Sequence, residues 1–206
     1  MFLNELTLKN VRNYRNLNLT MSPQVNIFFG LNAQGKTNLL EAIALLCLGR
    51  SFRTKKDQEL INRESECSYL SGSFETASGS VLIEIGIGAK ERRFKVDQQP
   101  VKPSAAFGRI TLVSFAPDDL QTIKGGPQYR RDFIDLYLAQ IEPKYRFVYY
   151  NYYKVLQQRN QILKTGNPNQ TELEVWDEQL ADKGAKVISY RMRLLASVQP
   201  FISQAH

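Results

Sequence analysis

The chain has 206 residues, which is enough for one large domain or two small ones with a buried core. Its composition, 43% hydrophobic and 23% charged, is ordinary for a soluble globular protein, and no apolar run is long enough to span a bilayer. The two cysteines, Cys47 and Cys67, fit neither a metal-binding spacing nor a disulfide framework. These features exclude membrane-spanning and disulfide-stapled secreted classes and predict a cytoplasmic protein.

The net charge of +7, from 27 basic and 20 acidic residues, is concentrated locally in basic clusters. The clusters are Lys9, Arg12 and Arg15; Arg50, Arg53, Lys55 and Lys56; Arg92, Arg93 and Lys95; Arg130 and Arg131. Such clusters suit a polyanion, for which the backbone of DNA is a plausible example. A solvated surface on a basic protein explains the charge equally well, so charge alone leaves both interpretations open.

The N-terminal region predicts strands on either side of a polar turn. Apolar and polar residues alternate over residues 3–9 and again over residues 17–21, as in half-buried strands. Residues 25–29 form a denser apolar run, which is typical of a strand buried on both faces. A helix should then cover residues 36–48 and end at Gly49, a usual C-cap residue.

The residues between that strand and that helix have the spacing G-x-x-x-x-G-K-T of a phosphate-binding loop. They are Gly30, Leu31, Asn32, Ala33, Gln34, Gly35, Lys36 and Thr37. The glycines let the backbone turn its N–H groups around an anion, and the helix N-terminus adds partial positive charge. Lys36 is placed to reach the β- and γ-phosphates, and the Thr37 hydroxyl is a Mg²⁺ ligand. We therefore predict nucleoside triphosphate binding; the alternative is a glycine-rich turn that Lys36 merely caps.

The middle of the chain predicts further strands. Residues 55–61 are compatible with a short helix. Residues 68–75 and 81–87 should form a hairpin, and residues 92–96 an edge-like strand with outward basic side chains. Residues 109–115 are predicted to be another buried strand.

After residue 125 the hydrophobic period changes from two to about 3.6, which predicts helices. The first should end at Pro143 and the second should span residues 144–164. A third should start at the Thr-x-x-Glu capping box of residues 171–174 and run to about residue 198, with Pro200 bending or ending it. The aromatic residues between positions 145 and 153 suit either stacking on bases or helix packing, and we favour packing.

The predicted fold is therefore α/β: a phosphate-loop NTPase lobe with a mixed sheet over residues 1–119, followed by an all-helical lobe over residues 120–206. A hydrolytic ATPase also needs a strand that ends in an acidic residue. The two nearest matches, Glu84 after residues 81–83 and Asp118 after residues 112–115, are unconvincing, because the first lies in an alternating hairpin strand and Ser114 and Pro117 interrupt the second. We therefore expect the chain to lack part of an ATPase head.

Three stretches are more specific than the phosphate loop alone. They are residues 10–14 (Asn-Val-Arg-Asn-Tyr), residues 48–54 (Leu-Gly-Arg-Ser-Phe-Arg-Thr), and residues 115–135, which contain Pro-Asp-Asp-Leu, Gly-Gly-Pro and Arg-Arg. Together with the loop and the following Asn-Leu-Leu-Glu-Ala-Ile, these stretches resemble the RecF family of DNA replication and repair proteins. The loop itself is shared with all SMC/Rad50-like ATPases.

This resemblance implies an ABC-type head with ATP and Mg²⁺ as cofactors, a helical second lobe and an ATP-dependent homodimer. It also implies binding to single- and double-stranded DNA at gaps or junctions, partnership with RecR and indirectly RecO in loading the RecA recombinase, and a role in the SOS response. Family members are weak DNA-dependent ATPases whose signature motif and acidic Walker B strand lie in a C-terminal section. We find neither here, so we assign no catalytic residue and expect this part to be inactive in hydrolysis by itself.

The resemblance also implies roles for particular residues. Arg12, Asn13 and Asn38 are assigned to the nucleotide site beside the loop. Asp118, with Ser114 and Asp119 as alternatives, is a candidate for the Mg²⁺ or water-sensing group. The candidate DNA-binding residues are Arg50, Arg53, Lys55, Lys56, Arg92, Arg93, Arg130 and Arg131, although Arg130 and Arg131 could instead pair with Asp132 or Asp135.

Two other functions remain open from the sequence. A small-molecule kinase uses the same loop, and residues 55–63 could mimic its lid, but the long helical segment without a nucleotide-closing motif argues against it. The chain could also be a module whose helices dock a partner without an ATP switch.

Overall fold

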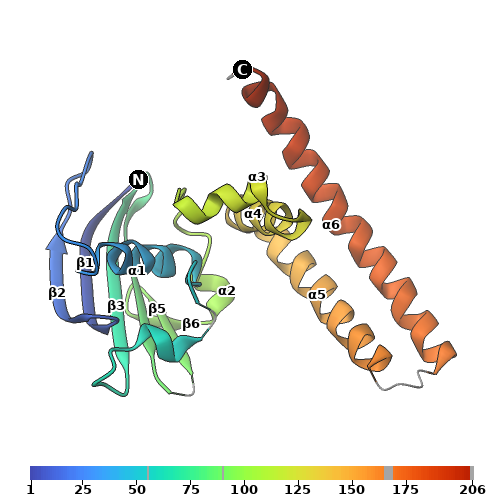
Figure 1. Cartoon of the computed structure of the whole chain (residues 1–206), viewed down its shortest axis with the longest axis horizontal. Coiled ribbons are helices and arrows are strands. Elements are labelled where there is room, and N and C mark those ends of the chain that lie inside the picture. The colour runs from blue at the N-terminus through green and yellow to red at the C-terminus, as the bar shows by residue number, and fades with distance from the viewer. Residues whose placement is uncertain (55, 90, 165–168, 205–206) are drawn as a thin grey trace. The chain divides into compact units, whose positions relative to one another are not determined.

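The computed structural model describes residues 1–54, 56–89, 91–164 and 169–204. Lys55, one of the residues predicted to bind DNA, lies outside the described residues. The chain divides into two compact units, Met1–Ser114 and Phe115–His206, and each is described by itself (Figure 1).

The first unit is built on a six-stranded antiparallel sheet in the order β2-β1-β3-β4-β5-β6 (Figure 1). Its strands are β1 (Phe2–Val11), β2 (Tyr14–Thr20), β3 (Ser68–Thr76), β4 (Gly79–Ile87), β5 (Arg92–Val96) and β6 (Gln99–Val101). Alternate residues such as Leu6 and Leu8 of β1 are fully buried, while Lys9 points outward. The alternation in the sequence therefore located the strands of this sheet correctly, except for the short β6.

Helix α1 (Lys36–Leu48) covers the buried face of the sheet (Figure 1). Its bounds match the predicted range, and Gly49 ends it with a φ of 69° and an N–H that donates to the Leu45 carbonyl, 2.9 Å away. A Cβ at Gly49 would lie 2.0 Å from the Phe107 ring, so both the backbone angle and the packing require glycine.

The two strands that we expected to be buried on both faces, residues 25–29 and 109–115, are absent from the sheet, so both predictions were wrong. Most of their large apolar side chains are exposed: Val25 (72%), Ile27 (79%), Phe29 (92%), Val113 (78%) and Phe115 (83%). A strand needs a neighbour to pair its backbone groups, and among the described residues no strand pairs with either segment. An apolar run indicates a tendency to form a strand, but it does not indicate whether a strand is present to pair with it.

Two further local predictions need correction. β5 is not an edge strand, because β6 pairs with it beyond the turn at Asp97 and Gln98, whose φ angles are both positive. The short helix expected within residues 55–61 is a single 3₁₀ turn, η1 (Asp57–Leu60). A four-residue helix, α2 (Pro103–Ala106), completes the elements of this unit.

The second unit is all-helical. After a 3₁₀ turn, η2 (Pro117–Leu120), it contains α3 (Gln121–Lys124), α4 (Pro127–Ile141), α5 (Pro143–Leu163) and α6 (Gln170–Gln204). The three long helices lie where the sequence predicted them, but α6 continues through Pro200, so the proline does not end it. Among the described residues, no helix combines the length and apolar character needed to cross a membrane.

The core of the helical unit is small and centres on Tyr145, which is fully buried with Leu138 and Val187. Asp135 of α4 accepts a hydrogen bond from the Tyr145 hydroxyl and a bidentate pair from Arg191 of α6, at 2.8 Å to each oxygen. Burial, followed by the hydrogen bond to Asp135, raises the pKa of the Tyr145 phenol. One carboxylate thus connects α4, α5 and α6, and at this position the aromatic series serves helix packing, as we favoured.

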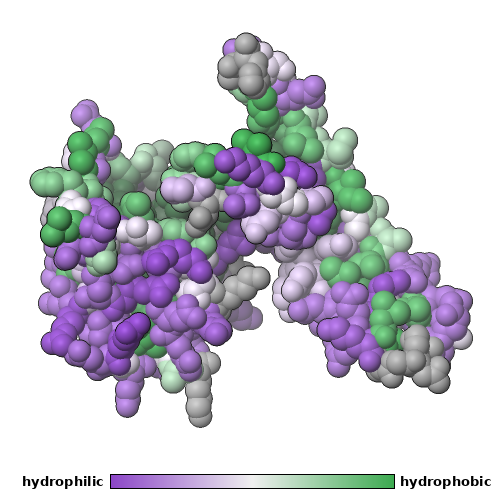
Figure 2. All heavy atoms as spheres, viewed as in Figure 1, coloured by the Kyte–Doolittle hydropathy of each residue, from purple (hydrophilic) through white to green (hydrophobic). Residues whose placement is uncertain are grey.

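Apolar side chains also lie on the surface of the helical unit. Figure 2 shows hydrophobic spheres along the exposed length of α6, where the exposed residues include Ile188, Met192, Leu195, Phe201 and Ile202. Ile188, Met192, Leu195 and Ile202 share one side of the helix, at successive spacings of four, three and seven residues.

Candidate functional site

The predicted phosphate loop connects the segment after β2 to the first turn of α1. Its backbone angles are those of a tight anion-binding turn, with φ of 148° at Gly30, 64° at Ala33 and 102° at Gly35. The Lys36 ammonium group donates to the carbonyl oxygens of Gly30 and Leu31, each 2.7 Å away. The lysine is thus folded over the loop, and both of its carbonyl contacts can be exchanged for phosphate oxygens.

The turn between β1 and β2 packs against the loop at Gly35, which is buried. A Cβ on Gly35 would lie 2.6 Å from Asn13 Nδ2 and 2.9 Å from the Tyr14 hydroxyl. With its positive φ, Gly35 is therefore required both by conformation and by close approach. The sequence predicted this glycine from spacing alone, and the structure adds the packing reason.

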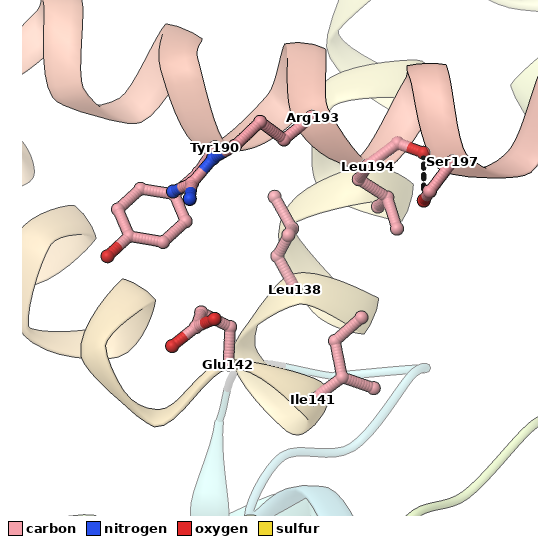
Figure 3. A pocket seen from close by; sticks show the side chains of 7 residues that line it. All are labelled: Leu138, Ile141, Glu142, Tyr190, Arg193, Leu194 and Ser197. Carbon is pink, nitrogen blue, oxygen red and sulfur yellow. Dashed lines mark hydrogen bonds between the residues drawn. The ribbon is translucent and has the colours of Figure 1, made fainter.

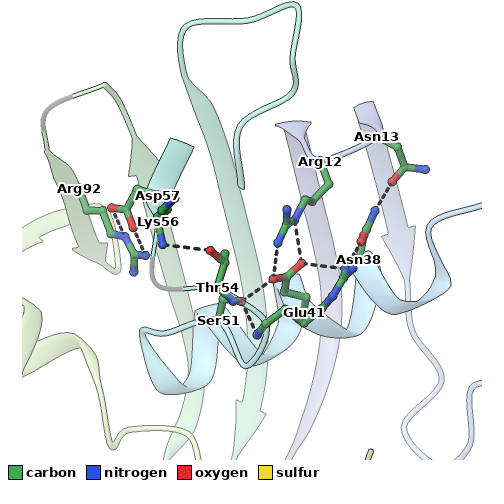
Figure 4. Close-up of polar contacts among 10 residues, drawn as sticks. Arg12, Asn13, Asn38, Glu41, Ser51, Thr54, Lys56, Asp57 and Arg92 are labelled. Carbon is green, nitrogen blue, oxygen red and sulfur yellow. Dashed lines mark hydrogen bonds and ion pairs between the residues drawn. The ribbon is translucent and has the colours of Figure 1, made fainter. Parts of the chain in front are cut away.

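A chain of side-chain hydrogen bonds leads away from the loop (Figure 4). Asn13 Nδ2 donates to the Gln34 carbonyl oxygen at 3.1 Å, and Asn38 Nδ2 donates to Asn13 Oδ1 at 2.8 Å. Arg53 donates to Asn38 Oδ1 at 2.6 Å. This series of hydrogen bonds joins residues from the β1–β2 turn, α1 and the segment after α1, which lie up to 40 positions apart in the sequence.

Glu41 anchors the far end of this chain. Its side chain is 1% exposed and accepts hydrogen bonds from Arg12 Nε at 2.9 Å and Arg12 Nη2 at 2.8 Å, and from Ser51 Oγ. Arg53 lies 3.5 Å from the same carboxylate. Burial alone would raise the pKa of Glu41, but the hydrogen bonds from Arg12 and Ser51 and the charges of Arg12 and Arg53 outweigh it, so the pKa lies below its usual value. With two arginines around one carboxylate, the cluster keeps an excess positive charge beside the loop.

The expected nucleotide-site residues therefore lie together, although not all in the same way. Asn13 and Asn38 both lie beside the loop, as the sequence suggested. Arg12 points to Glu41 instead, and its carbonyl accepts a hydrogen bond from Asn62 Nδ2 at 2.7 Å. Asn32 and Gln34 are exposed on the loop.

The predicted Mg²⁺ ligands are less well defined. Thr37 is exposed in the first turn of α1, directly after Lys36. Asp118 belongs to η2 in the other unit, where Asp119 accepts a hydrogen bond from the Ala116 N–H at 2.7 Å. In the part of the chain that the structure describes, no group of three or more His, Cys, Asp or Glu residues could hold a metal by itself.

The candidate DNA-binding residues of the first unit differ in how far their side chains are exposed and engaged by protein partners. Arg92 is held by Asp57 and donates to the Gly49 carbonyl at 2.7 Å, so it supports the fold. Arg93 pairs with Glu91 on the surface, at 2.6 Å, and its side chain remains 82% exposed. Arg50 and Lys56 are exposed as well.

Arg130 and Arg131, the candidates in the second unit, do not make the ion pairs that we considered for them. Arg130 donates to the Gly125 carbonyl at 3.1 Å, and Arg131 donates to Gln128 Oε1 at 2.9 Å. Asp135 is engaged by Arg191 instead. Arg130 therefore closes the turn before α4, while both side chains remain on the surface.

The helical unit has a small pocket of about 230 Å³ between α4 and α6 (Figure 3). Leu138, Ile141, Glu142, Tyr190, Arg193, Leu194 and Ser197 line it. Arg193 stacks over the Tyr190 ring at 4.4 Å. The volume is below the ~300 Å³ at which small-molecule sites usually begin, so we do not assign the nucleotide to this pocket.

Sequence reasoning did not assign roles to Glu41, Ser51 or Asp57. A signal for Glu41 was present, because it is a charged residue among Leu39, Ala42 and Leu45 on the buried side of α1. A charge at such a position is seldom buried unless it is paired. The identity of its partner, 29 positions earlier in the chain, has no local signal.

Comparisons with known proteins show which family the chain belongs to. The family model described as "AAA domain" matches residues 5–189. The chain is 40% identical over its whole length to the DNA replication and repair protein RecF of Alkaliphilus oremlandii (strain OhILAs), and 42% identical to that of Streptococcus pneumoniae (strain P1031). The chain belongs to the AAA-domain family, and over its whole length it is similar to RecF proteins. It spans 57% of the length of these two relatives.

Solved structures give the same assignment. A structure of the recombination mediator protein RecF-ATPrS in the RecFOR pathway matches 96% of this chain with a TM-score of 0.90 and 36% identity, and the match covers 55% of that structure. A structure of SMC ATPases matches 66% of this chain and 99% of its own, with a TM-score of 0.56 and 19% identity, which shows a shared fold. The fold is thus that of a phosphate-loop ATPase of the ABC/SMC type.

Proposed function

We propose that this chain binds ATP at the loop of residues 30–37 and that ATP controls its binding to DNA in recombinational repair. The observation that carries the proposal is the loop itself, with Lys36 folded over the Gly30 and Leu31 carbonyls and Gly35 buried against Asn13. Support also comes from the similar solved structure of RecF-ATP in the RecFOR pathway, which has 36% identity and a TM-score of 0.89.

Each part of the loop has a physical role in this proposal. The backbone N–H groups of residues 30–37 hold phosphate oxygens, and Lys36 leaves its carbonyl partners to contact the β- and γ-phosphates. The Thr37 hydroxyl is available to a Mg²⁺ ion, and such an ion offsets phosphate charge. Since the charge excess of the Glu41 cluster lies beside the loop, it favours an anionic ligand there.

For DNA binding, the exposed cations carry the proposal. Arg50, Lys56 and Arg93 are exposed, whereas Arg92 and Arg130 have structural partners and should contribute less. From the similarity to RecF proteins we propose that the DNA is gapped or contains a junction. On the same ground we propose that the whole protein acts as an ATP-dependent homodimer with RecR, and indirectly RecO, to load RecA and support the SOS response.

We propose that this part of the protein binds ATP without hydrolysing it. Glu84, the nearest match to an acidic strand end, lies within antiparallel strand β4 and accepts a hydrogen bond from the Tyr69 hydroxyl at 2.8 Å. It therefore has a structural partner on the sheet. Hydrolysis would need a carboxylate positioned at the γ-phosphate.

The experiment first measures the affinity of the chain for ATP. It then measures the affinity for a gapped DNA, with and without Mg-ATP, at two salt concentrations. Lys36→Ala should weaken ATP binding by at least about tenfold, because charged hydrogen bonds to phosphate are lost, and it should remove any gain in DNA affinity caused by ATP. Lys186→Ala is the matched control. It removes one positive charge from an exposed pair with Asp182 on α6 and should change neither.

Each outcome decides part of the proposal. If ATP tightens DNA binding and Lys36→Ala abolishes that gain, ATP control is supported. If DNA binds with a steep salt dependence but ATP has no effect, the basic surface is supported and ATP control by this part is refuted. If neither ligand binds, the chain is a partner-docking module and the proposal is wrong.

A further inference from the structure

We propose that Asn13 and Asn38 are positioning residues for the phosphate loop, and that they act as a one-way hydrogen-bond relay instead of contacting the nucleotide. The relay runs from Arg53 through Asn38 and Asn13 to the carbonyl of Gln34. Figure 4 shows its central step, between Asn38 and Asn13. This inference rests on the proposed ATP binding. It explains how the loop is held in the conformation that binds phosphate.

The direction of the relay is fixed by the chemistry of its two ends. Arg53 can only donate, so Asn38 must turn its Oδ1 toward it and its Nδ2 toward Asn13. The Gln34 carbonyl can only accept, so Asn13 must turn its Nδ2 toward it. Both asparagines accept from one side and donate to the other, and neither amide can flip without breaking two hydrogen bonds.

The relay ends on a peptide group that belongs to the anion-binding turn. In a trans peptide the C=O and the N–H point in opposite directions, and the described residues contain no cis peptide. By holding the Gln34 carbonyl, Asn13 therefore fixes the direction of the Gly35 N–H, which points the opposite way within the same peptide plane. In the proposal this N–H is one of the donors to a phosphate oxygen, and the relay sets its direction before the ligand arrives.

The start of the relay is firmly anchored. The N–H groups of Arg53 and Thr54 both donate to Ser51 Oγ, at 2.9 and 3.0 Å, and Ser51 in turn donates to the buried Glu41. Arg53 itself lies 3.5 Å from Glu41. A flexible arginine could not fix the orientation of the two amide groups, whereas Arg53 is held at both its backbone and its side chain.

The alternative is that Asn13 and Asn38 bind the nucleotide directly. Each of them has both its oxygen and its nitrogen engaged by protein partners already, at 2.6 to 3.1 Å. A direct contact with phosphate would have to come from the second N–H of either amide, because the first N–H already serves a protein acceptor. The relay instead predicts that the two residues act as one unit, so that losing either one has the same effect as losing both. It also predicts that they affect the binding of phosphate groups and not of the base or ribose.

The test is a double-mutant cycle with Asn13→Ala, Asn38→Ala and both combined, in the same chain. Dissociation constants are measured for ATP and for inorganic tripolyphosphate, which lacks the base and the ribose. Each single substitution should weaken binding of both ligands by about tenfold, and the double substitution should weaken it no further than either single one, because one break already disconnects the relay. Melting temperatures should stay within a few degrees, since the bonds lie at the surface.

Asn18→Ala is the control, because Asn18 is an exposed asparagine on the neighbouring strand β2, and it should bind like the parent chain. Losses that multiply in the double variant, or losses for ATP without losses for tripolyphosphate, would show direct ligand contacts and overturn the relay. Single variants that bind as tightly as the parent overturn it as well. If the parent chain binds neither ATP nor tripolyphosphate, the proposed function itself fails, which is a separate result.

Discussion

Glu41 is a single charged side chain on the buried face of α1, next to apolar residues such as Leu45. Its two hydrogen bonds from Arg12, and the Ser51 contact, offset the cost of removing the carboxylate from water. Removing one member of such a pair leaves the other charge without a partner, which lowers the free energy of unfolding.

We expect Glu41→Gln to lower the free energy of unfolding by about 3 kcal/mol at neutral pH. The folded-state pKa of Glu41 is below its ordinary value of 4.5, so on acidification the unfolded state takes up the proton first. The contribution of the carboxylate is therefore complete above pH 4.5 and is lost as the pH falls below it, through the folded-state pKa. Urea denaturation of both proteins from pH 3 to pH 7 should show the gap narrowing on the acidic side; a constant gap would contradict the ion pair.

At this scale the sequence predicted the loop but not the contacts that support it. Gly30, Gly35 and Lys36 belong to a spacing that is local and chemically specific, so their placement could be predicted. The contact between Arg53 and Asn38, and that between Arg12 and Glu41, join residues 15 and 29 positions apart. Such pairs depend on how the elements pack, and the local pattern contains no information about that.

At the scale of elements, helices and antiparallel strands followed their periodicity, because each buries one face and the hydrophobic pattern records which face it is. The predictions for residues 25–29 and 109–115 failed for a different reason. Continuous apolar runs fit a strand with neighbours on both sides, and within the described residues those neighbours do not occur. The strand over residues 81–87 was predicted from alternation instead, and β4 pairs with both β3 and β5.

The junction of α4, α5 and α6 gives a second test of a buried carboxylate. Asp135→Asn should destabilise the helical unit by about 3 kcal/mol, because it removes the charge that Arg191 and Tyr145 share. Guanidinium unfolding followed by circular dichroism at 222 nm would measure the change. The matched control is Asp182→Asn on α6, which breaks an exposed pair with Lys186 and should leave the free energy of unfolding almost unchanged. Equal effects of the two substitutions would show that the junction is not a stabilising centre.

For the whole molecule, the two units have separate cores and should unfold as separate transitions. The single tryptophan, Trp176, lies in α6, so its fluorescence reports on the helical unit alone. Leu70→Ala in β3, at a fully buried position, should cost about 2–5 kcal/mol in the first unit and leave the tryptophan transition unchanged. Thermal unfolding followed by fluorescence and by calorimetry tests this, and a tryptophan transition that moves with Leu70→Ala would mean that the units unfold as one.

The exposed apolar runs at residues 25–29 and 113–115 have a consequence for how the molecule behaves in a crowded solution. Neither run belongs to a strand of the sheet, and exposed apolar segments adhere to one another when molecules collide. Collisions between molecules grow with the square of concentration, so association through these runs should increase steeply as the protein is concentrated.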